Sequence, residues 1–137
     1  MITMSIVGFN FEKIMVEKKN KVSSNLKIKS NLSIVDIEKE NLNLTSAGDV
    51  LKFNFEYGVD YEPEIGKIVL NGNLLYMEDP ENIKKILEDW KKDKKLPKPL
   101  MAQIFNTILA KSNIKALSLT QEVNLPPHIK LPILKNK

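Results

Sequence analysis

Residues 50–61 read VLKFNFEYGVDY, and this stretch decides the fold class. Apolar and aromatic side chains stand at every second position, with polar or small residues between them. Because side chains alternate between the two faces of a strand, the stretch predicts a β-strand with one buried and one wet face. Such strands are typical of an antiparallel sheet that is covered on one side. The buried face would carry Leu51, Phe53, Phe55, Tyr57, Val59 and Tyr61.

The segment before this strand predicts a first strand over residues 5–18. Three apolar residues of its first half share one face: Val7, Phe9 and Phe11. Ile14 and Val16 have the opposite parity, so they would point to the other face of a regular strand. A β-bulge or strong twist near residues 12–13 would bring both halves onto the same face.

Two more strands are predicted on either side of the central one. Residues 25–44 alternate at first, lose the alternation near Val35 and Ile37, and regain it at Leu42 and Leu44, which predicts one long strand or two halves. Residues 65–77 predict a fourth strand. Its apolar face would carry Ile68, Leu70, Leu74 and Tyr76.

The pattern changes to a helical period after residue 78. Asp79 is a good N-cap, and Pro80 suits the first helical position. An apolar stripe then recurs at helical spacing: Ile83, Ile86, Leu87 and Trp90. KKLPKP, residues 94–99, ends this helix, and a second helix begins near Pro99. Its stripe contains Met101, Ile104, Phe105, Ile108 and Leu109 and extends toward Leu117.

Four strands followed by two helices predict an α+β fold. We expect a four-stranded antiparallel sheet with the two C-terminal helices packed on one face, in a single domain that spans residues 1–137. The chain ends in NLPPHIKLPILKNK, residues 124–137, which is apolar and rich in proline. The prolines would keep this tail extended, with its leucines and isoleucines lying along the body or along a neighbouring subunit.

The composition is that of an ordinary globular protein. Of 137 residues, 42% are hydrophobic and 28% charged, and the absence of cysteine excludes disulfides and thiolate metal sites. We see neither a signal peptide nor a membrane span, so the expected location is cytoplasmic. The net charge of +4 comes from lysines without arginine, which favours a solvated surface. The alternative is a weak electrostatic site for RNA or the ribosome.

Groups that carry catalysis are scarce in the sequence. The single histidine, His128, stands near prolines without a partner close by in sequence, and the five glycines form no phosphate-binding loop. Asp60, Glu62 and Glu64 alternate at a turn, but their spacing does not match a calcium loop. We therefore expect neither an enzyme nor a bound metal or cofactor, although carboxylates from distant positions could still meet in the fold.

The apolar residues outnumber what a small sheet needs. One helical layer can cover one face of the sheet, yet the parity changes of residues 25–44 and the apolar tail require further surface. This surplus predicts an oligomer interface or an apolar groove.

The order of elements and two proline-containing segments resemble the SecB family of export chaperones. Pro97, Pro99 and Leu100 lead into a helix that carries Ile104 and Ile108, as in the family. The tail is similar to the family pattern Pro-x-Leu-x-Leu-x-Pro-Val, with the last proline one residue early. Its matching residues are Pro127, Ile129, Leu131, Pro132 and Ile133.

The resemblance implies an ATP-independent holdase that binds unfolded polypeptides in apolar grooves and forms a homo-oligomer (dimer or tetramer). It also suggests a link to protein export. The candidate client-binding residues are Phe9, Phe11, Phe53, Phe55, Tyr57, Tyr76, Trp90 and Leu100. Bacterial members are acidic and dock a translocation motor, whereas this chain is basic, so the holdase role is favoured over a dedicated export role. The alternatives are a basic RNA- or ribosome-associated binding module and a structural subunit whose apolar surplus serves oligomerisation.

Overall fold

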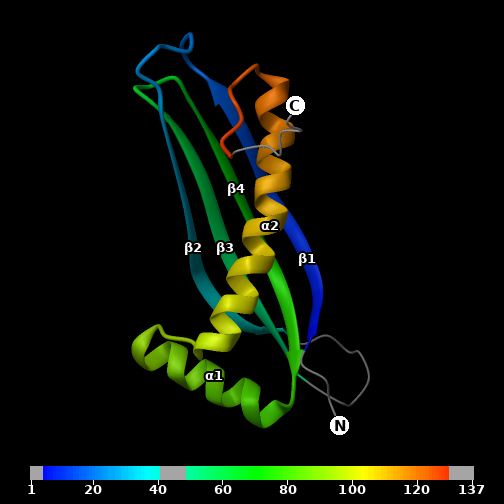
Figure 1. The fold of residues 1–137 in the computed structure, drawn as a ribbon. Coiled ribbons are helices and arrows are strands. Elements are labelled where there is room, and N and C mark those ends of the chain that lie inside the picture. The colour runs from blue at the N-terminus through cyan, green and yellow to red at the C-terminus, as the bar shows by residue number, and fades with distance from the viewer. Residues whose placement is uncertain (1–4, 41–48, 130–137) are drawn as a thin grey trace, which may run out of the picture.

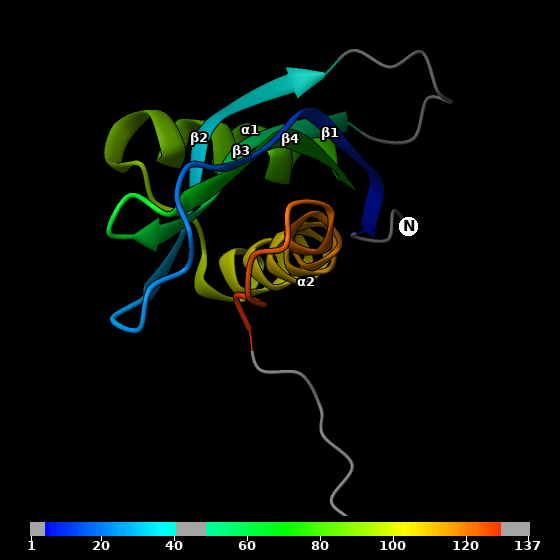
Figure 2. The same ribbon diagram turned by 90° about the horizontal axis from the view of Figure 1, so that it is seen from above.

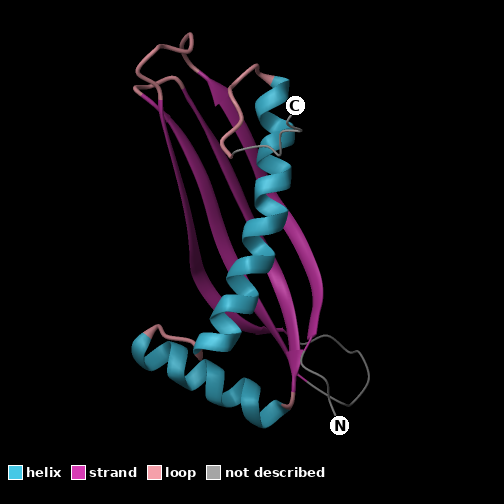
Figure 3. Cartoon of the chain, in the orientation of Figure 1, coloured by secondary structure: helices cyan, strands magenta, loops and turns pink. Residues whose placement is uncertain are grey.

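The computed structural model describes residues 5–40 and 49–129, which form a four-stranded antiparallel sheet and two helices (Figure 1). The strands are β1 (Ser5–Lys18), β2 (Lys27–Glu40), β3 (Asp49–Glu62) and β4 (Gly66–Glu78), and the helices are α1 (Pro80–Asp93) and α2 (Lys98–Glu122). The strand order is β1-β4-β3-β2, with every neighbouring pair antiparallel. Figure 3 distinguishes the strands of the sheet from the helices, and the strands precede the helices along the chain, so the predicted α+β fold is confirmed.

The alternation of β3 sets the covered face of the sheet. All six residues predicted to face the core are at most 2% exposed: Leu51, Phe53, Phe55, Tyr57, Val59 and Tyr61. Between them, Glu56 and Asp60 are exposed, because they lie on the face that no helix covers. The prediction from residues 50–61 is therefore confirmed, since a one-residue shift would have turned six large side chains to solvent.

Bulges correct the alternation of both edge strands. The register of β1 against β4 shifts between Phe11 and Lys13, as the change of parity predicts. A second shift, between Ile6 and Gly8, was not predicted. It places Ile6 on the core and leaves Val7 43% exposed, so the expectation that Val7 shares a face with Phe9 is wrong.

The wavering pattern in β2 has the same cause. The register against β3 shifts between Ile34 and Asp36, which leaves Val35 in the bulge and 59% exposed. Ile37 returns to the core face and is 5% exposed. One long strand therefore replaces the alternative of two halves, within the part of residues 25–44 that the structure describes; Leu42 and Leu44 lie outside it.

Helix α2 lies along the covered face, and the sheet arches over it (Figure 2). Its buried residues recur at every fourth position: Leu100, Ile104, Ile108, Ser112, Ala116 and Thr120. Four residues turn an α-helix by about 40° more than a full circle, so this stripe winds around α2 and matches a twisted sheet. The helix continues to Glu122, beyond the predicted stripe, and begins at Lys98, one residue before the predicted start.

Helix α1 crosses one end of the sheet on the same covered side (Figure 1). Pro80 occupies the first turn and Asp79 the N-cap position, as predicted, although the Asp79 side chain makes no capping hydrogen bond. Ile83, Ile86 and Trp90 are buried and join the core around Phe53. Of the predicted apolar tail, residues 124–129 are described, and residues 130–137 lie outside the described part of the chain.

Candidate functional site

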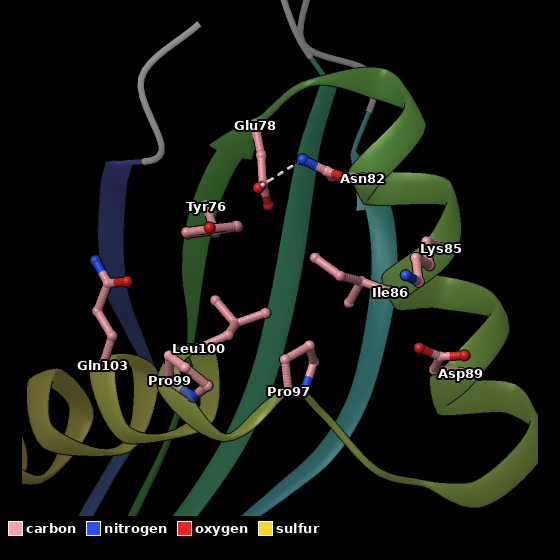
Figure 4. Close-up of a pocket in the computed structure, with 10 residues that line it drawn as sticks. All are labelled: Tyr76, Glu78, Asn82, Lys85, Ile86, Asp89, Pro97, Pro99, Leu100 and Gln103. Atoms are coloured by element: carbon pink, nitrogen blue, oxygen red, sulfur yellow. Dashed lines mark hydrogen bonds between the residues drawn. The ribbon is translucent and has the colours of Figure 1, made fainter.

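A cleft of about 300 Å³ opens between the end of β4, helix α1 and the start of α2 (Figure 4). Its floor is apolar and consists of Tyr76, Ile86 and Leu100, which are 1%, 5% and 7% exposed. Pro97 and Pro99 form the side next to the loop between the helices. An apolar floor beneath an open mouth is the usual character of a site for an apolar ligand group.

Polar side chains surround this floor. Asn82, Lys85 and Asp89 reach the cleft from α1, Gln103 reaches it from α2, and Glu78 reaches it from β4. Asn82, Lys85, Ile86 and Asp89 follow the spacing i, i+3, i+4 and i+7, so a single face of α1 lines the cleft. A polar rim around an apolar floor can place a peptide backbone while the floor receives its side chains.

Glu78 is the most unusual member of the rim, because its side chain is charged and only 6% exposed. Asn82 Nδ2 donates a hydrogen bond to Glu78 Oε1 across 3.0 Å (Figure 4). Burial raises the pKa of Tyr76, and a hydrogen bond to Glu78 and the charge of its carboxylate raise it further. Tyr76 therefore remains neutral. The hydrogen bond between Glu78 and Asn82 connects the end of β4 to the first turns of α1.

A second group of aromatic residues lies on the β1 side of the covered face. The rings of Phe9 and Phe55 stack at 5.3 Å, and Phe11 meets Phe9 edge-on at 5.1 Å. Lys111 Nζ of α2 lies 5.4 Å from the centre of the Phe9 ring. A side chain at Gly72 would clash with the Asn10 backbone oxygen and with Phe55, so glycine is required for this packing.

The eight residues predicted to bind clients therefore do not form one groove. Tyr76 and Leu100 meet at the cleft floor, and Phe9 and Phe11 are partly buried near the β1 edge. Phe53, Phe55 and Tyr57 are at most 2% exposed in the core beneath α2. A client could reach these three only if α2 moved, and their binding role stays a prediction.

Trp90 occupies a separate place. It is 7% exposed, packs in the core between α1 and the sheet, and does not line the cleft. Lys94 Nζ lies 5.2 Å from the centre of its ring. Its binding role also stays a prediction.

Sequence reasoning missed the whole polar rim: Glu78, Asn82, Lys85, Asp89 and Gln103. One signal was present, because three of these residues share the spacing of a single face of α1 next to the apolar stripe. Ile86 was predicted as part of that stripe, but its position beside a cleft was not predicted. A sequence pattern does not indicate which side of a helix other elements leave uncovered.

The acidic turn does not assemble a cation site within the described residues. Glu62 Oε1 lies 3.3 Å from Lys29 Nζ, Glu64 is exposed, and Asp60 lies on the uncovered face of β3. Over residues 5–40 and 49–129, no three histidine, cysteine, aspartate or glutamate side chains come close enough to hold a metal ion. None of the helices that the structure describes is long and apolar enough to cross a membrane.

Comparison with known proteins supports the fold. No protein-family model matches the sequence, and no curated protein matches it either. Among solved structures, the chain is similar to the Rv1957 SecB-like chaperone of Mycobacterium tuberculosis, which was solved in complex with a ChAD peptide from the Rv1956 HigA1 antitoxin. The TM-score is 0.57 at 12% sequence identity, over 96% of this chain and 90% of that chain. The chain therefore shares the fold of a SecB-like chaperone, although the two sequences are too different for this likeness to be found by sequence comparison.

Proposed function

We propose that this protein is an ATP-independent holdase chaperone, and that the cleft between β4, α1 and α2 binds extended apolar segments of unfolded polypeptides. The observation that carries the proposal is the apolar floor of Tyr76, Ile86 and Leu100 beneath an open, polar rim. The shared fold supports it, because the similar chaperone Rv1957 was solved with a peptide bound.

The size of the cleft limits what it can bind alone. Burial of one leucine-sized side chain contributes about 1.5–3 kcal/mol, whereas micromolar affinity requires about 8 kcal/mol. Several clefts that hold one client chain would raise the overall affinity about 10²- to 10⁴-fold. A holdase built on this cleft therefore needs several copies in one assembly.

Exposed apolar side chains on α2 and on β1 support such an assembly. Leu109 and Ile114 on α2 are 39% and 71% exposed, and Val7 and Ile14 on β1 are 43% and 46% exposed. β1 is also an edge of the sheet, so its backbone can pair with another strand. We propose a homo-oligomer, dimer or tetramer, and we propose the cytoplasm as its location, since a chain without cysteine suits a reducing compartment.

A role in protein export is the finer part of the proposal. The chain carries a net charge of +4 with lysine as its basic residue, unlike the acidic members of the SecB family that it resembles. Docking of a translocation motor through an acidic surface is therefore not part of the proposed mechanism. General protection of unfolded chains does not require an acidic docking surface, so this role suits a basic protein better.

A second candidate function is weak binding of RNA or the ribosome. Five exposed lysines gather at the end of α1 and in the loop after it: Lys91, Lys92, Lys94, Lys95 and Lys98. Such binding depends on phosphate contacts and falls steeply with salt, whereas apolar burial does not. Binding of a labelled RNA that disappears between 50 and 200 mM salt, together with no effect on client aggregation, would favour this function.

The test is suppression of aggregation of an unrelated unfolded protein at stoichiometric amounts. Gln103→Trp places an indole at the cleft mouth from an exposed position, so it should block the cleft and leave the core intact. We expect at least a tenfold rise in the concentration required for half suppression. Gln121→Trp, at an exposed position near the other end of α2, is the matched control and should behave as wild type. Equal suppression by both variants would exclude the cleft as the binding site.

A further inference from the structure

The segment after α2 folds back over the opposite end of the sheet, and we call residues 123–129 the strap. Asn124 has a positive φ of 57°, which reverses the chain, and Leu125 N donates to Thr120 O. Leu125 is 5% exposed and packs in a core cluster with Tyr57, Tyr61 and Ile65. The strap therefore covers an apolar surface at this end of the molecule.

Two tyrosine hydroxyls of β3 hold the strap and its neighbour on α2. Tyr61 Oη donates a hydrogen bond to the backbone oxygen of Pro126. Tyr57 Oη donates to Asn113 Oδ1 at 2.6 Å, and His128 Nε2 lies 3.1 Å from the same oxygen. Because that oxygen accepts, His128 Nε2 must carry the proton in the closed strap. The second ring nitrogen, Nδ1, is buried and has no partner among the described residues.

Protonation of His128 would place a charge and a new N–H at Nδ1. No described residue accepts that hydrogen bond, and an unpaired buried donor is costly. Protonation therefore acts against the closed strap. Burial lowers the pKa of His128, as expected for an imidazole that the fold holds in its neutral form.

The charged and titratable groups around His128 do not compensate its charge. From β3, Tyr57 and Tyr61 face the strap, and burial raises the pKa of both to about 12, so they remain neutral. The partners of Tyr57 across the sheet, Leu32 and Leu70, are apolar. The β3 carboxylates Glu56 and Asp60 lie on the uncovered face.

The other elements contribute lysines. From β1, Lys18 Nζ donates to the backbone oxygen of Asn124 at 3.4 Å. Lys111 and Lys115 are each two residues from Asn113, on the far side of α2, and Lys111 Nζ lies over the Phe9 ring. Among the described residues, therefore, none supplies a carboxylate that would compensate the charge of a protonated imidazole.

We propose that the surface beneath the strap is a second peptide-binding surface, occupied by the chain's own residues 125–129 and uncovered when His128 is protonated. Its occupant defines the partner that it fits: an extended apolar segment with a backbone carbonyl that accepts a hydrogen bond from Tyr61. This inference goes beyond the proposed function, because the surface lies at the opposite end of α2 from the cleft.

The direction of the pH effect follows from linkage. The open strap has an ordinary histidine pKa near 6.5, and the closed strap has a lower one. The closed state is therefore fully favoured above pH 6.5, and the ratio of closed to open falls up to tenfold for each pH unit below it. The ratio of closed to open strap stops falling when the pH drops below the lowered pKa of His128 in the closed state.

The first test measures opening by NMR hydrogen exchange of the full chain, without any client. We expect the protection factor of the Leu125 amide to fall by up to about fivefold from pH 6.5 to 5.5, while that of Leu70 in β4 stays constant. His128→Gln keeps an N–H donor near Asn113 and cannot titrate, so its Leu125 protection should be constant. An unchanged protection factor in wild type, the same fall in His128→Gln, or a parallel fall at Leu70 would each overturn the proposal.

The second test measures occupancy with a fluorescent peptide, LPPQIKLPIL, which is residues 125–134 with glutamine in place of the histidine. Apparent affinity scales with the open fraction, so wild type should bind this peptide up to about fivefold more tightly at pH 5.5 than at pH 6.5. His128→Gln should show no such gain. Opening without tighter peptide binding would overturn the proposal, and the Gln103→Trp variant, which blocks the cleft alone, should retain the gain.

Discussion

The two ends of α2 meet the same sheet in different ways. In its first half the buried residues are large, namely Leu100, Ile104 and Ile108, and a cleft remains beside them. In its second half they are small, namely Ser112, Ala116 and Thr120, and the sheet supplies the bulk through Tyr57 and Tyr61. The chain then covers the second end with its own strap.

This difference teaches where the molecule has space for another polypeptide. At the strap end the chain's own residues already fill the apolar surface and accept the hydrogen bond of the Tyr61 hydroxyl. At the cleft end the floor is apolar, and the described part of the chain leaves it open. Three substitutions test whether the two ends are built as described.

The largest effect is expected from Ile104→Ala, in the half of α2 that packs with large side chains. Ile104 is fully buried, so its truncation should cost about 3–4 kcal/mol in the free energy of unfolding, measured with urea. Ile114→Ala, on the same helix at a 71% exposed position, is the matched control and should change stability by less than about 0.5 kcal/mol. Similar losses in both variants would contradict the assignment of the buried stripe.

The second test adds bulk where the helix uses small residues. Ala116→Leu inserts three carbons at a fully buried position opposite the tyrosines, and we expect it to cost about 2 kcal/mol through overpacking. Ser118→Leu, at an exposed position of the same turn, should be nearly neutral. A neutral Ala116→Leu would show that this end also contains free space, and the contrast between the two ends would be lost.

The smallest effect is expected from Tyr61→Phe. It removes the hydrogen bond to the Pro126 carbonyl and keeps the ring, so stability should fall by about 1 kcal/mol. Because the lost bond holds the strap, the Leu125 amide should lose protection while the centre of β4 retains it. Uniform loss of protection would mean that Tyr61 supports the whole core and not the strap in particular.

Much of this fold follows from local patterns. The alternation of residues 50–61 was enough to define the covered face, because six large side chains cannot all face solvent. The bulge at residue 12 follows from the change of parity between Phe11 and Ile14. The bulge at Val7 had no such signal, because Ile6 and Val7 are both apolar and either could face the core.

The site was less predictable, because it depends on how distant elements meet. Tyr76 and Leu100 were predicted as binding residues, and they meet at the cleft floor. Phe53 and Phe55 carry the same kind of side chain but are buried beneath α2. The residue type alone does not indicate whether an aromatic side chain lines a cleft or packs in the core. The contacts of Tyr57 with Asn113 and of Tyr61 with Pro126 span 56 and 65 residues, beyond any local pattern.

The most direct test of the central claim is methyl NMR of the isoleucine and leucine side chains during titration with an unfolded client. If the cleft is the client-binding site, the methyl signals of Ile86 and Leu100 should shift or broaden at client concentrations that give protection from aggregation. The methyl signals of Ile68, buried at the strap end, should stay in place at neutral pH. Client binding that leaves Ile86 and Leu100 unchanged would contradict the account.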